Sequence, residues 1–96
     1  MRLLTTEILK KEANRHPVGG GGYQYTEKIG DYTLSIVGGF SGQYGDFEND
    51  FEVALIDDTD GRFVTGMYSK RGESDGVMVY ASIDEINDLY LNIPRK

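Results

Sequence analysis

The sequence contains no cysteine, no tryptophan, one histidine and two prolines among its 96 residues. The absence of cysteine excludes disulfide bonds, thiolate nucleophiles and thiolate metal sites. Because small domains of oxidising compartments usually carry disulfides, it also favours a cytoplasmic location. No apolar run approaches the ~18 residues of a membrane span, and Glu7 interrupts the N-terminal segment before a signal peptide could form. We therefore expect a single cytoplasmic domain, residues 1–96, with no membrane partner.

Basic residues are scarce, which gives the chain a formal net charge of −6. The deficit lies in residues 29–93, where thirteen acidic residues face only Arg62, Lys70 and Arg71. Nucleic-acid binding depends on a basic face that neutralises phosphates, so direct binding of nucleic acid is disfavoured. A protein with a basic surface is the better candidate partner for this part of the chain.

The acidic residues are densest between positions 46 and 60, a stretch that holds no basic residue: Asp46, Glu48, Asp50, Glu52, Asp57, Asp58 and Asp60. Two interpretations stay open. The first is a solvated strand face with a turn, because Glu52 alternates with Phe51 and Val53. The second is a charged patch that docks on a basic groove of another protein, in which case these carboxylates belong to the interface.

Hydrophobic periodicity predicts an α+β fold with an N-terminal helix over residues 4–15 and a C-terminal helix after Ser82. The C-terminal helix begins with a capping box formed by Ser82 and Glu85, and Pro94 ends it. Five strands are expected between the helices, at residues 23–29, 32–37, 51–56, 62–68 and 77–81. Short connections such as Gly30-Asp31 favour a largely antiparallel five-stranded meander with both helices on one face.

No motif for catalysis, metal binding or a cofactor emerges from the sequence. Placing Gly61 at position six of a calcium loop puts Ile56 and Met67 at ligand positions, and neither can bind calcium. The only histidine, His16, precedes Pro17 without a neighbouring carboxylate to orient it. We therefore expect no enzymatic activity and no cofactor.

A glycine-rich loop over residues 38–47 combines backbone freedom with three aromatic side chains, Phe40, Tyr44 and Phe47. It lacks the Gly-Lys-Ser/Thr sequence of a phosphate-binding loop, and acidic residues follow it at once. Either it is a flexible connection, or its aromatics anchor a partner. We predict that at least one of the three is more than half exposed.

Several short segments resemble small accessory proteins of tailed bacteriophages. They are Tyr-Thr-Leu-Ser-Ile-Val-Gly-Gly at 32–39, Tyr-Gly at 44–45, Phe-Glu-Val-Ala at 51–54 and Ile-Asp-Glu-Ile-Asn at 83–87. Gly-Val-Met-Val-Tyr at 76–80 stands where those proteins have Asp-Val-x-Gly-Tyr. The resemblance covers residues 32–93 and implies an intracellular viral protein that binds a host component in the host cytoplasm.

Charge and resemblance together predict a binding protein that inhibits a host defence or nucleic-acid-handling protein through its acidic surface. One alternative is a small-ligand protein that sequesters a nucleotide-like signal in the glycine-rich loop. A basic residue such as Lys70 or Arg71 should then face that loop. The other alternative is a structural or assembly component, which should form a defined homo-oligomer.

Overall fold

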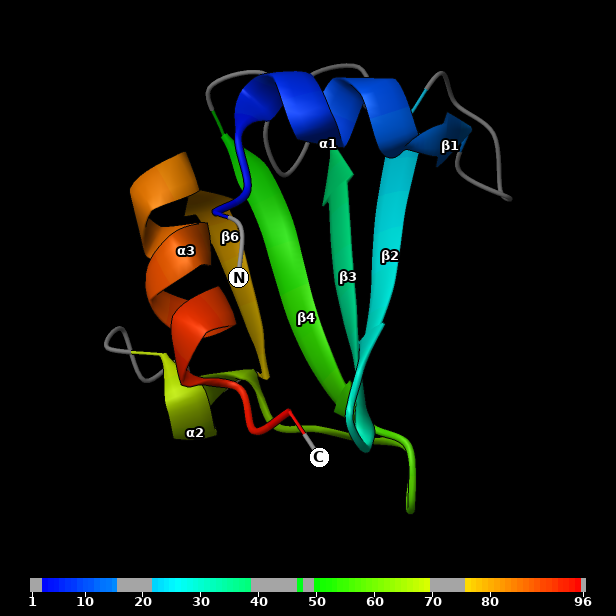
Figure 1. The fold of residues 1–96 in the computed structure, drawn as a ribbon, viewed down its shortest axis with the longest axis vertical. Helices are drawn as coiled ribbons and strands as arrows, with labels where there is room; N and C mark the ends of the chain where they lie inside the picture. Colours follow the sequence, from blue (N-terminus) through cyan, green and yellow to red (C-terminus); the bar gives the residue numbers. More distant parts are fainter. Residues whose placement is uncertain (1–2, 16–21, 39–46, 48–49, 70–75, 96) are drawn as a thin grey trace.

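The computed structural model describes residues 3–15, 22–38, 47, 50–69 and 76–95 and confirms an α+β fold (Figure 1). Its antiparallel sheet contains, in chain order, β1 (Asn14–Arg15), β2 (Tyr23–Ile29), β3 (Tyr32–Gly38), β4 (Phe51–Asp57) and β5 (Arg62–Phe63), each paired with the next. The last strand, β6 (Val77–Ala81), returns to pair with β4. The helices within these described residues are α1 (Thr6–Glu12), α2 (Thr65–Tyr68) and α3 (Ile83–Asn92).

The two longer helices, α1 and α3, lie on the same side of the sheet, with α1 across one end and α3 beside β6 (Figure 1). Strand alternation sends every second side chain to that side. Leu34 and Ile36 of β3 and Phe51, Val53 and Leu55 of β4 are buried there. They share one core with side chains of both helices: Leu9, Ile86, Leu89 and Tyr90.

Local sequence signals explain how both helices begin. Thr5 caps α1 by accepting a hydrogen bond from the Ile8 amide at 3.1 Å. In α3 the capping box is complete. The Glu85 amide donates to the Ser82 hydroxyl at 3.2 Å, and the Ser82 amide donates to the Glu85 carboxylate at 2.9 Å. Asn87 also joins α3 to the N-terminal segment, because its amide group bonds both backbone groups of Leu4 at 2.8 Å.

The first expected helix is shorter than predicted. It ends at Glu12, and Ala13 is already extended, with φ −73° and ψ 149°. Asn14 and Arg15 then pair with Gln24 and Tyr23 of β2. Backbone hydrogen bonds to the sheet therefore replace the last turn that the sequence pattern favoured.

The expected strand over residues 62–68 is wrong beyond Phe63, because residues 65–68 form α2. Thr65 explains the change. Its buried hydroxyl donates to the carbonyl of Gly76 and accepts from the Leu55 amide at 2.8 Å. Tyr68, at the end of α2, also shares a 2.8 Å hydrogen bond with the Tyr32 hydroxyl. Contacts with distant segments thus decide the local conformation here.

We expect Ser82→Ala to lower the free energy of unfolding by about 1 kcal/mol, because the first turn of α3 loses the acceptor for the Glu85 amide. Ser82→Thr keeps a capping hydroxyl and serves as the control. Chemical denaturation of the three proteins measures the difference. Equal stability of Ser82→Ala and the wild type would contradict this account of the cap.

Candidate functional site

The side of the sheet that faces away from α1 and α3 is called the outer face here. Its side chains alternate with the buried ones along each strand, and the registers align them across the sheet. Ile56 lies opposite Phe63, and Ala54 lies opposite Val77. The residues of the outer face include Gln24, Thr26, Lys28, Thr33, Ser35, Val37, Glu52, Ala54, Ile56, Phe63 and Val77. All of them are exposed or half-buried.

Two turns meet at one end of the sheet and bring four carboxylates together. The turn between β2 and β3 contains Asp31, and the turn between β4 and β5 runs from Asp58 to Gly61. The Asp58 amide donates to the Asp31 carbonyl at 2.9 Å, which ties the two turns to each other. We call this group of four carboxylates the acidic end: Asp31, Asp57, Asp58 and Asp60.

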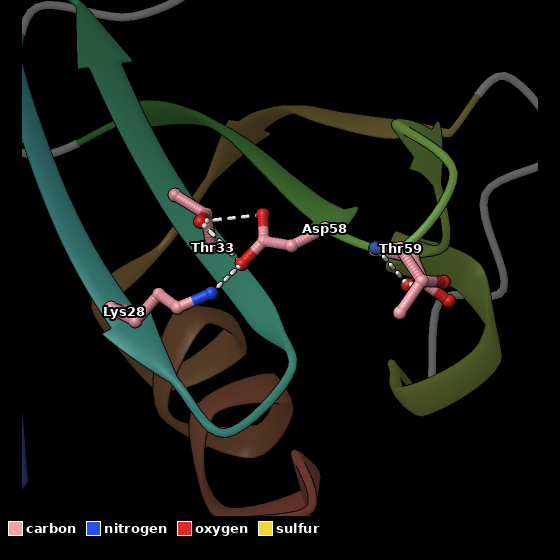
Figure 2. Close-up of polar contacts among 5 residues, drawn as sticks. Lys28, Thr33, Asp58 and Thr59 are labelled. Carbon is pink, nitrogen blue, oxygen red and sulfur yellow. Dashed lines mark hydrogen bonds and ion pairs between the residues drawn. The ribbon is translucent and has the colours of Figure 1, made fainter.

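Asp58 is the best-anchored of these carboxylates. Figure 2 shows the Lys28 ammonium and the Thr33 hydroxyl both reaching it from the outer face. The Thr33 hydroxyl lies 2.8 Å from one carboxylate oxygen and 3.1 Å from the other. The hydrogen bond from Lys28, followed by that from Thr33, lowers the pKa of Asp58 below its ordinary value of 3.8. The group therefore stays ionised at neutral pH.

Asp57 and Asp60 are held by their own turn. The hydroxyl and the amide of Thr59 donate to Asp57 at 2.7 and 2.9 Å, and these bonds lower the pKa of Asp57. Asp60 accepts from the Arg62 amide at 3.0 Å, and its carboxylate lies 3.9 Å from the Arg62 guanidinium. Of the described residues at this end, Lys28 and Arg62 are the cations, so four carboxylates outnumber two positive charges.

The acidic stretch does not form one continuous patch in the part that the structure describes. Asp50 and Glu52 lie at the start of β4, half-buried, whereas Asp57 ends that strand. At roughly 3.3 Å per residue, the two ends of β4 lie about 20 Å apart. Asp46 and Glu48 lie outside the described residues. The structure groups Asp57, Asp58 and Asp60, and it adds Asp31, which sequence reasoning recognised only as a turn residue.

Phe47 does not supply the exposed anchor that the sequence suggested. Its side chain is only 3% exposed, and its ring packs edge-on against Phe51 with the centroids 5.2 Å apart. Gly38 permits this position, because a Cβ atom there would lie 3.0 Å from the Phe47 amide nitrogen. Phe40 and Tyr44 lie outside the described residues, so the prediction of an exposed aromatic in this loop now depends on them alone.

Phe63 is an exposed aromatic that no sequence pattern had indicated as a binding residue. It lies on β5, one residue after Arg62 and opposite Ile56, and it is 56% exposed. It therefore adds apolar area to the outer face directly beside the acidic end. The turn sequence Asp57–Gly61 could have indicated Phe63 as a candidate. A hairpin turn places the first residues of its second strand next to the charged residues of the turn.

Comparisons with known protein families, with curated proteins and with solved structures find no match. The resemblance to phage accessory proteins therefore stays a prediction from the sequence. Within residues 3–15, 22–38, 47, 50–69 and 76–95, no three His, Asp or Glu side chains converge as metal ligands would. In the same residues, no helix is long and apolar enough to cross a membrane.

The lowered pKa of Asp58 predicts a pH-dependent contribution to stability. A depressed carboxyl pKa stabilises the fold above the unfolded value, 3.8, and this stabilisation is lost as the pH falls through the folded value. We expect Asp58→Asn to lower the melting temperature at about pH 7 and to have a smaller effect at about pH 2. The matched control is Asp84→Asn on α3. A decrease for Asp58→Asn that is the same at both pH values would contradict the assigned contacts.

Proposed function

We propose that this protein is a non-enzymatic binding protein that docks on a basic surface of another protein. The observation that carries the proposal is the acidic end, where two tied turns present four carboxylates against two cations among the described residues. Charge complementarity of this kind steers association and selects partners. The partner proposed on the sequence resemblance is a host component of a phage infection, a defence or nucleic-acid-handling protein that is inhibited when bound.

The outer face supplies the apolar part of this interface. Ile56 and Phe63 lie side by side in the sheet register, and Val77 lies opposite Ala54. Protein interfaces typically combine an apolar centre with a polar rim, and aromatic residues often supply the binding energy. Phe63 at the centre and Asp58 and Asp60 beside it fit that arrangement.

Of the two alternative functions, the first depends on residues that the structure does not describe. A nucleotide-like ligand in the glycine-rich loop would involve residues 39–46 together with Lys70 or Arg71. A structural role predicts a homo-oligomer. Sedimentation of the purified protein separates this last alternative from the proposal, because the proposed interface serves a different, basic partner.

Reversing charge at the acidic end should reduce partner binding without unfolding the protein. We choose Asp31→Lys with Asp60→Lys, because replacing Asp58 would also remove the acceptor of Lys28 and Thr33. The double variant and the wild type, each immobilised, are incubated with bacterial lysate at low salt and eluted with high salt. We expect the variant to lose the proteins that salt releases from the wild type, because salt screens charge pairs.

The control for this experiment is Glu7→Lys with Asp84→Lys, which makes the same charge change on the exposed starts of α1 and α3. The first turns of α1 and α3, which carry these positions, lie at the opposite end of the sheet from the turns that join β2 to β3 and β4 to β5 (Figure 1). Capture of the same proteins by the wild type and by Asp31→Lys/Asp60→Lys would overturn the electrostatic interface. The electrostatic interface would also be overturned if only the control variant lost the captured proteins.

Truncating Phe63 should weaken the complex more than it affects the fold. An aromatic anchor at the centre of an interface typically contributes about 2 kcal/mol or more, roughly a thirtyfold change in affinity. The control is Leu91→Ala on α3, since Leu91 is also about half exposed, at 50%. Surface plasmon resonance with the captured partner measures both. Equal effects of Phe63→Ala and Leu91→Ala would exclude the outer face as the interface centre.

A further inference from the structure

Strand β2 forms an open edge of the sheet over four residues. On one side, all of β2 pairs with β3, from Tyr23 opposite Gly38 to Ile29 opposite Tyr32. On the other side, β1 pairs only with Tyr23 and Gln24. No other described strand pairs with Thr26–Ile29 on that side. About 13 Å of regular strand edge is therefore open to a further strand.

This edge lacks the distortions that commonly protect edges from pairing. Its register with β3 is continuous, and β2 contains no proline. Strand β6, by contrast, has an irregular register where it passes Phe51 and Val53, and Tyr80 there has a positive φ of 51°. A bulge of this kind bends a strand and interrupts pairing. The regular edge of β2 is thus the better acceptor for a strand.

Glu27 gives the open edge a fixed negative charge. Its carboxylate accepts hydrogen bonds from the Tyr25 hydroxyl at 2.6 Å and from the Tyr90 hydroxyl at 2.8 Å, one on each oxygen. Each oxygen keeps a second lone pair for another donor. The two phenols therefore orient the carboxylate while leaving it able to bind a cation. Glu27 is half-buried, so this charge is less screened than one on a fully exposed side chain.

The charge at Glu27 argues against pairing between two copies of the protein. In a symmetric antiparallel pair centred on Glu27, Glu27 lies opposite its own equivalent, and in one centred on Lys28, Lys28 lies opposite its own equivalent. Directly opposed like charges destabilise a strand pair. A strand with lysine or arginine at that position instead places a cation opposite the carboxylate, within reach of the second lone pairs.

We propose that the open edge of β2, Thr26–Ile29, binds an extended segment of the partner by strand addition, with a lysine or arginine opposite Glu27. Backbone hydrogen bonds supply the affinity in this mode, and side-chain pairs supply the specificity. The inference rests on the proposed function in taking a basic partner, but it assigns the contact to β2 and not to the acidic end.

Three synthetic peptides test the edge: acetyl-Thr-Val-Thr-Lys-Thr-Val-Thr-amide, its Lys→Glu form, and its Lys→norleucine form. We expect the lysine peptide to bind on the order of tenfold more tightly than the glutamate peptide, since an attractive cross-strand pair replaces a repulsive one. The norleucine peptide should fall between them. Hydrogen exchange should show new protection at alternate amides within Thr26–Ile29, because only every second amide of a strand faces its edge.

Backbone methylation separates strand addition from simple charge attraction. Two further lysine peptides carry N-methyl groups on alternate residues, one set on the odd positions and one set on the even positions. One set blocks the hydrogen bonds to β2, so we expect one peptide to lose binding and the other to keep it. Equal binding of the two, or no binding of the lysine peptide at about 1 mM, would overturn the proposal.

Protein variants then locate the charge. Glu27→Lys should reverse the preference, so that the glutamate peptide binds more tightly than the lysine peptide. If this variant does not fold, the binding of the methylated peptides to the wild-type protein still tests strand addition. Asp31→Lys/Asp60→Lys should bind the lysine peptide within about twofold of the wild type. A different result would place the contact at the acidic end: the double variant loses peptide binding, and Glu27→Lys keeps the wild-type preference for the lysine peptide. That result would overturn the proposal of strand addition at β2 and leave the proposed function intact.

Discussion

One-sided burial of the sheet is the constraint on which the rest of the structure depends. Among the described residues, the two longer helices, α1 and α3, both cover the same face. The alternation of buried and outward-facing side chains along β3 and β4 follows from this arrangement. Leu34 and Leu55 must face the helices, while Thr33 and Ile56 face outward. A domain this small buries only about two thirds of its unfolded surface. The described residues of its outer face are accordingly exposed or half-buried.

The sequence predicted the parts of the fold that depend on interactions between residues close together in the chain. Ser82 and Glu85 form the predicted capping box, and Gly30, with a φ of 57°, makes the predicted two-residue turn. The alternation of Phe51, Val53 and Leu55 gave the correct buried face of β4. In each case, the deciding interaction lies within a few residues of the signal, so a pattern along the chain is sufficient.

The sequence was a poor guide where contacts between distant residues determine the local conformation or the burial of a side chain. The strand pattern after Phe63 was overridden because the Thr65 hydroxyl bonds both Leu55 and Gly76. Phe47 was one of three loop aromatics of which at least one was expected to be exposed. It is buried instead, with a positive φ of 58°, and its ring contacts those of Tyr23 and Phe51. The acidic end was predicted only in part. Asp57, Asp58 and Asp60 were named, but Asp31 joins them through the contact between two turns.

The acidic end and the open edge of β2 are adjacent in the chain, and both present negative charge to a partner. Ile29 ends the open edge, and Asp31 follows two residues later within the turn that Asp58 holds. Lys28, between Glu27 and this turn, is already bound to Asp58 across the outer face. The positive charge of the edge is thus directed away from Glu27 and matched by a carboxylate. A partner whose basic segment pairs with Glu27 along β2 could place a second basic group at the acidic end, so the two contacts are separate but favour the same kind of partner.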